Sequence, residues 1–132
     1  MKITADTNVL VRLFTADDPE QATLAADVLE QADVVAISLQ SLCELVWVLE
    51  RAYKTKRIDI AVAIRQLLAT RNLVVNRPAV EAGLAVFEAG GDFADGIIAY
   101  DGSFLGGETF VSFDKKAVRI LMEQGRSAQL LS

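Results

Sequence analysis

Acidic side chains at a few separate places are the residues of this chain that could do chemistry. Asp6 follows the short β-forming run 3–5, and a helical pattern begins directly after it. Asp114 repeats this arrangement between the strand-like run 109–113 and a last helical segment. In open parallel sheets, the crevices that bind ligands form at the carboxyl ends of the strands. The sequence therefore predicts acids at that edge of a sheet.

Three further acids stand in helical patterns. Glu44 lies in the apolar segment 42–49 and has no lysine or arginine three or four residues away. Burial of an unpaired charge is costly, so Glu44 needs a partner, a metal or a solvent-facing position. Asp92 and Asp95 lie three residues apart at a helix start, where Asp92 fits the cap and Asp95 falls on the same face. Capping or the helix dipole would account for each of these aspartates singly, but acids on one face repel each other unless a cation intervenes.

The residue types that are missing narrow the chemistry. The chain contains no histidine and only one cysteine, Cys43. This excludes Ser-His-Asp and Cys-His catalytic systems and zinc sites that need imidazole. Ligation by oxygen alone favours Mg²⁺ or Mn²⁺. A carboxylate-held ion of this kind most often serves phosphoryl chemistry, because it activates water and neutralises the leaving oxygen.

The segments that must position these acids alternate between strand-like and helical patterns. Strands are predicted at 3–5, 34–37, 73–75, 109–113 and 128–131, and helices at 7–15, 19–31, 39–53, 60–70, 78–89, 92–103 and 115–124. Such alternation predicts an α/β fold of three layers, with a central, mostly parallel, twisted sheet of four or five short strands flanked by helices. A length of 132 residues without a linker or repeat predicts one domain, 1–132.

The composition limits which binding partners and which cellular compartment we expect. No apolar run is long enough to span a membrane, and the amino terminus has no secretion signature, so we expect a cytoplasmic protein. The net charge of −5 counts mildly against a nucleic-acid partner. A local group of basic residues could nevertheless contact nucleic acid, but a solvent-exposed connector between two helices explains it more simply. The group consists of Arg51, Lys54, Lys56 and Arg57.

Several motifs together resemble a known family. They are Asp6-Thr7-Asn8, Glu44, Asp92-Phe93-Ala94-Asp95 and Ser112-Phe113-Asp114, and in this order they resemble PIN-domain proteins, more closely the VapC-like toxins of bacterial type II toxin–antitoxin systems. The resemblance covers essentially the whole chain. It implies a PIN-like fold and a ribonuclease dependent on Mg²⁺ or Mn²⁺ that cuts RNA. It also implies a cognate antitoxin as partner and a homodimer, with Trp47 and Phe104 as candidate contacts, although the core is the expected place for Trp47.

The resemblance also implies roles for particular residues. Asp6, Glu44, Asp95 and Asp114 would form a catalytic acidic quartet, in which Asp6 and Asp95 are the central metal ligands. Supporting roles fall to Thr7 or Asn8, which would orient Asp6 or contact the phosphate, to Asp92 as a helper and to Ser112 beside the last acid. The four basic residues of 51–57 are candidate guides for RNA. Asp101-Gly102 departs from the family's pattern and predicts a short or irregular end to its helix.

Three other interpretations remain open. A phosphoacceptor receiver domain would have paired acids directly after the first strand, where this chain has Thr7-Asn8, and would leave Glu44 unexplained. A phosphatase with an aspartyl nucleophile would need an acid two residues after the first, where Asn8 stands. A catalytically silent interaction domain of the same fold would keep the acids without cleaving RNA.

Overall fold

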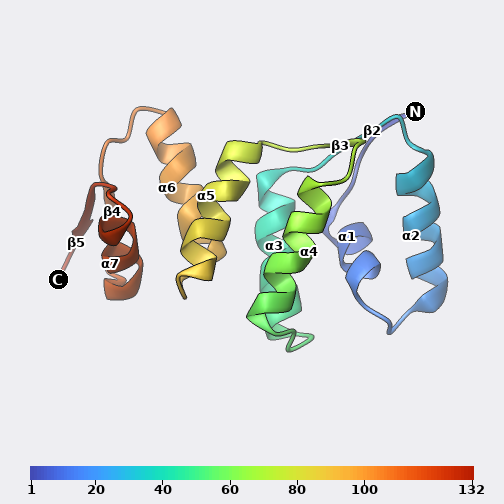
Figure 1. The fold of residues 1–132 in the computed structure, drawn as a ribbon, viewed down its shortest axis with the longest axis horizontal. Coiled ribbons are helices and arrows are strands. Elements are labelled where there is room, and N and C mark those ends of the chain that lie inside the picture. The colour runs from blue at the N-terminus through green and yellow to red at the C-terminus, as the bar shows by residue number, and fades with distance from the viewer. The chain divides into compact units, whose positions relative to one another are not determined.

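The computed structural model describes residues 1–132 as seven helices and five short strands, all paired in parallel (Figure 1). Two compact units divide the chain, Met1–Asn76 and Arg77–Ser132. In chain order the elements are β1 (Lys2–Thr4), α1 (Thr7–Phe14), α2 (Pro19–Gln31), β2 (Val34–Ala36), α3 (Leu39–Arg51), α4 (Arg57–Leu68), β3 (Leu73–Val74), α5 (Arg77–Glu88), α6 (Phe93–Phe104), β4 (Phe110–Ser112), α7 (Lys115–Glu123) and β5 (Ala128–Leu130).

The first unit holds a three-stranded parallel sheet in the order β1-β2-β3. Ile3 pairs with Val35, and Val35 pairs with Leu73. The middle strand is apolar and Val35 is fully buried, as expected for a parallel strand covered by helices. The helices contribute the largest fully buried side chains of this unit: Leu10, Leu42, Leu45, Leu49, Ile60 and Ile64.

The second unit holds the parallel pair β4-β5 and three helices. Its core contains Val86, Ala99, Ile120 and Leu121, with Phe110 and Ala128 packed against them. Every element of the unit except α5 and α6 is nine residues or shorter, so its stability depends on tertiary packing more than on helix propensity.

Two glycines bring α5 and α6 into close contact. A Cβ atom on Gly96 would lie 2.4 Å from the carbonyl oxygen of Ala82, and one on Gly83 would lie 2.8 Å from the Phe93 ring. Both distances are shorter than real Cβ contacts, so the helices can approach this closely only where both positions lack a side chain. The Phe93 ring is buried in turn and meets Phe87 edge-on, at 6.5 Å between centroids.

The α/β class with parallel strands is confirmed, and most predicted elements lie within two residues of their expected bounds. The five strands occur as a three-stranded sheet and a separate pair. Gly102 does not interrupt α6, which continues to Phe104 and then ends irregularly, with the amide of Leu105 bonded to both Asp101 and Gly102 carbonyls. No helix is both long enough and apolar enough to cross a membrane.

Two local expectations are wrong. The helix predicted at 60–70 begins three residues earlier, as α4 at Arg57, and Lys56 before it forms no side-chain cap. Trp47 is 59% exposed, not in the core. Its indole ring lies under the Arg51 guanidinium, 5.7 Å from the ring centroid, and such a contact allows an aromatic ring to stay at the surface.

Candidate functional site

Asp6 and Asp114 have the same local geometry. Each lies two residues beyond the end of a parallel strand and caps the helix that follows. Oδ1 of Asp6 accepts a hydrogen bond from the Val9 amide at 3.2 Å, and Oδ1 of Asp114 accepts from the amides of Lys116 and Ala117 at 2.9 and 3.2 Å. In both residues Oδ2 has no partner in the protein. Capping therefore fixes each carboxylate and leaves one oxygen of it available to a ligand.

Ser112 stabilises the start of α7, and Asp92 stabilises the start of α6. The amide of Asp114 donates to Oγ of Ser112 at 3.0 Å, which fixes the turn from β4 into α7. Asp92 caps α6 by accepting from the Ala94 amide at 3.1 Å. Ser112 thus contacts the backbone of an acid of the predicted quartet, whereas Asp92 contacts only Ala94. The supporting roles of both residues stay predictions.

Glu44 lies on the exposed side of α3 and has no cationic partner. Oε2 accepts a hydrogen bond from the Thr7 hydroxyl at 3.1 Å, and Oε1 accepts from the Gln40 amide at 3.4 Å. Both donors are neutral, so they orient the carboxylate without neutralising its charge. Thr7 thus contacts Glu44, where the sequence predicted a contact with Asp6 or a phosphate. Asn8 lines a shallow groove between α1 and α2 together with Asp6.

Asp95 is the one acid whose carboxyl pKa is clearly raised. It is half-buried in the first turn of α6, and its side chain has no hydrogen bond or ion pair. Burial raises the pKa of its carboxyl above the usual value, and the negative charges of Asp92 and Asp114 raise that pKa further. The second unit therefore brings three acids close enough to repel one another, and a positive ion among them would relieve that repulsion.

The donor set fits a hard divalent cation. All predicted ligands are carboxylates, several with an oxygen that no protein donor occupies, and such ligands suit Mg²⁺ or Mn²⁺. Asp6 and Glu44 belong to the first unit, and Asp95 and Asp114 belong to the second. Within either unit, no three acidic, histidine or cysteine side chains are arranged to hold a metal by themselves.

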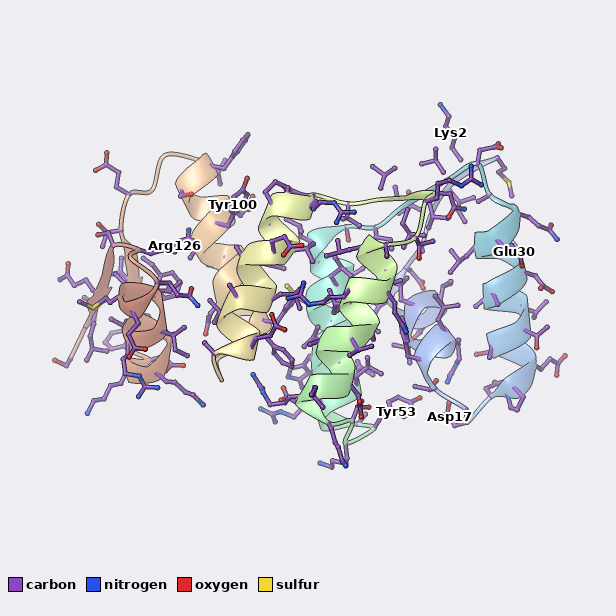
Figure 2. The ribbon with its side chains drawn as sticks, in the orientation of Figure 1. Lys2, Asp17, Glu30, Tyr53, Tyr100 and Arg126 are labelled. Atoms are coloured by element: carbon purple, nitrogen blue, oxygen red, sulfur yellow. The ribbon has the colours of Figure 1, made fainter.

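A hydrogen-bonded network that the sequence did not reveal holds α1 against the turn that follows α3. Nη1 of Arg12 donates to Asp17 at 2.8 Å and to the Tyr53 hydroxyl at 3.3 Å, and the same hydroxyl donates to Asp17 at 2.7 Å. Asp17 and Tyr53 lie side by side although 36 residues separate them (Figure 2). The hydrogen bond from Tyr53 and the charge of Arg12 lower the pKa of the Asp17 carboxyl. With the Thr7–Glu44 contact, this network ties α1, near both of its ends, to α3 and the turn that follows α3.

The four basic residues predicted to guide RNA differ in their surroundings. Arg57 forms an ion pair with Glu50 at 2.6 Å, and Arg51 covers Trp47. Lys54 and Lys56 are exposed, and Lys54 has a positive φ of 54° in the turn between α3 and α4. Two members of this group are thus engaged with their own neighbours.

A comparison with known protein families shows which family this chain belongs to. The PIN domain family matches residues 3–120, nearly the whole chain. The chain belongs to the PIN-domain family. No curated protein matched it. PIN domains are generally nucleases that act on nucleic acid and typically use divalent metal ions, so this PIN domain has a nuclease-type fold.

Proposed function

We propose that this PIN-domain protein is an endoribonuclease dependent on Mg²⁺ or Mn²⁺ that acts as the toxin of a toxin–antitoxin pair. Membership in the PIN family supports nuclease chemistry. The observation that carries the metal dependence is the set of carboxylates without cationic partners, above all Asp95 with its raised pKa. The family match extends across both compact units, which supports the further proposal that residues 1–132 act as one PIN domain.

Each acid has a proposed role. Asp6 and Asp95 hold the ion, and Asp114 and Glu44 complete the acidic set. A divalent cation, when bound, would neutralise charge on the phosphate and lower the pKa of the water that it binds. Glu44 accepts a proton from the attacking water or orients it, and the Thr7 hydroxyl holds the Glu44 carboxylate in place at 3.1 Å. Ser112 keeps Asp114 at the helix start through the Asp114 amide.

RNA cleavage with defined product ends tests the activity. The purified protein is incubated with RNA in Mg²⁺, in Mn²⁺ and in EDTA, and the ends of the products are mapped. Attack by water predicts 5′-phosphate and 3′-hydroxyl ends, with activity in either metal and none in EDTA. Products with 2′,3′-cyclic phosphate would contradict the proposal, because they require attack by the ribose hydroxyl. Absence of metal-dependent cleavage would favour the silent interaction domain.

The toxin role and the partners need separate tests. Induced expression is expected to arrest growth, and co-expression of a small protein encoded beside this one is expected to restore growth and to co-purify with it. The Asp6→Asn variant should not arrest growth. Light scattering on the purified chain tests the proposed homodimer. Growth arrest that persists in the Asp6→Asn variant would separate toxicity from cleavage.

A further inference from the structure

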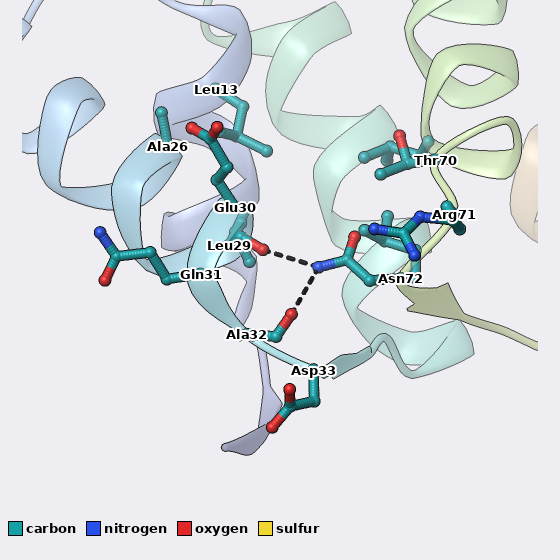
Figure 3. A pocket seen from close by; sticks show the side chains of 12 residues that line it. Leu13, Ala26, Leu29, Glu30, Gln31, Ala32, Asp33, Thr70, Arg71 and Asn72 are labelled. Atoms are coloured by element: carbon teal, nitrogen blue, oxygen red, sulfur yellow. Dashed lines mark hydrogen bonds between the residues drawn. The ribbon is translucent and has the colours of Figure 1, made fainter.

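A cavity of about 730 Å³ lies in the first unit, between the ends of α2 and α4 (Figure 3). Its apolar lining includes Leu29 and Leu67, which are buried, and Leu13 and Leu73, which are half-buried. The volume is in the range of small-molecule sites. The cavity lies where β2 and β3 begin, whereas Asp6 follows the end of β1, so the two places are at opposite edges of the same parallel sheet.

Asn72 presents a fixed hydrogen-bond acceptor to this cavity. Its Nδ2 donates to the carbonyl oxygens of Leu29 and Ala32, at 2.8 and 2.9 Å, as the dashed lines in Figure 3 show. These two bonds use both amide hydrogens and settle which atom is nitrogen. Oδ1 therefore points away from those carbonyls and has no donor from the protein. A ligand in the cavity can donate to it.

An unpaired carboxylate and two helix ends at the cavity favour a positive ligand, although Arg71 also lines it. The Glu30 carboxylate lines it and has no hydrogen bond or ion pair, whereas Asp33 pairs with the amino-terminal ammonium of Met1. Helices α2 and α4 both end here, and the carboxyl end of a helix carries partial negative charge. Arg71 is the one cationic side chain in the lining; it is exposed and has no carboxylate partner.

We propose that this cavity binds a small organic cation, a primary ammonium group on an apolar body. The ammonium donates to Oδ1 of Asn72 and lies near the Glu30 carboxylate, and the apolar body covers the leucines. None of the acids of the proposed nuclease site takes part, so this proposal stands or falls independently of that function.

Titration of the ¹⁵N-labelled full chain with 1-hexylamine at neutral pH tests the proposal, with 1-hexanol as the uncharged probe of matched size. Saturable shifts are expected in the amides of residues 29–33 and 70–73 with hexylamine, and weaker shifts with hexanol. No saturable shift in these segments with hexylamine, or equal affinity for hexanol, would overturn the proposal.

Two charge variants should change the affinity in opposite directions. Glu30→Gln should weaken hexylamine binding about two- to fivefold, the range for an exposed ion pair, and Arg71→Gln should strengthen it by a similar factor. Asp27→Asn is the matched control, because Asp27 is exposed on the same helix but does not line the cavity. Its affinity should equal that of the unchanged protein. The reverse signs at Glu30 and Arg71 would show that the ammonium group does not lie near the Glu30 carboxylate, and would contradict the proposal.

Discussion

At the scale of single residues, Asp6 caps a helix and still has one carboxylate oxygen free of protein partners. One oxygen caps α1 and the other has no partner in the protein. Asp114 does the same for α7. A residue that caps a helix at the end of a parallel strand is therefore fixed in position before any ligand arrives, and its structural role does not argue against a catalytic one.

Substitutions at Asp6 can separate its role as a helix cap from its proposed role as a metal ligand. Asparagine caps a helix about as well as aspartate, so Asp6→Asn should change the free energy of unfolding by less than about 0.5 kcal/mol while abolishing cleavage. Asp6→Ala should abolish cleavage and also cost about 1 kcal/mol, because the Val9 amide loses its acceptor. Urea unfolding and the RNA assay measure the two effects. Full cleavage by the Asp6→Asn variant would remove Asp6 from the metal site.

The charged Asp95 carboxylate should lower the free energy of unfolding of the metal-free protein. Burial and the charges of Asp92 and Asp114 raise its pKa in the folded state above the value in the unfolded chain. The folded state then binds the proton more tightly, so this residue's contribution to stability improves as pH falls through the folded pKa towards the unfolded value of about 3.9. At neutral pH the charged carboxylate is destabilising.

Asp95→Asn should therefore raise the melting temperature of the metal-free protein at neutral pH, while cleavage is lost. The difference between the two proteins should shrink as the pH is lowered from neutrality to about 4. Thermal unfolding in EDTA at several pH values measures this difference in melting temperature. A melting temperature lowered by the substitution at neutral pH would show that the Asp95 charge is not repelled in the folded state.

At the scale of elements, side-chain patterns located most helices because the capping chemistry is local. Ser38 caps α3 through the Ser41 amide, Asp18 and Pro19 start α2, and Gly125, with a φ of 80°, follows the end of α7. The start of α4 was missed because Lys56 offers no capping side chain. The sequence could not predict the hydrogen-bonded network of Arg12, Asp17 and Tyr53, because Tyr53 reaches the other two only when α1 packs on α3.

The α5–α6 contact gives a prediction at the same scale. Gly96→Ala should destabilise the protein by about 1–3 kcal/mol, because the new methyl group would meet the Ala82 carbonyl. Gly102→Ala is the matched control in the same helix, where a Cβ meets nothing within 4 Å. It should stabilise by about 0.5–1 kcal/mol through helix propensity. Chemical denaturation of both variants tests this, and equal stabilisation of the two would refute the close packing.

At the scale of the whole molecule, the order of strands and helices could be predicted from the sequence, and the family match agrees with that fold. The starts of α1 and α7 at Asp6 and Asp114 could also be predicted, because capping is local. What each acid contacts could not be predicted. The partners of Glu44 and the raised pKa of Asp95 depend on which residues the fold brings near, and the separation of the strands into a sheet and a pair leaves no trace in a strand's own sequence.

Binding of Mn²⁺, measured by the electron paramagnetic resonance signal of the free ion, tests the central claim most directly. The claim is the proposal that Asp6 and Asp95 are both metal ligands. Asp6→Asn, from the first unit, and Asp95→Asn, from the second, should each weaken Mn²⁺ binding at least about tenfold, while Asp27→Asn should leave it unchanged. Mn²⁺ affinity that survives either of the first two substitutions would contradict the account.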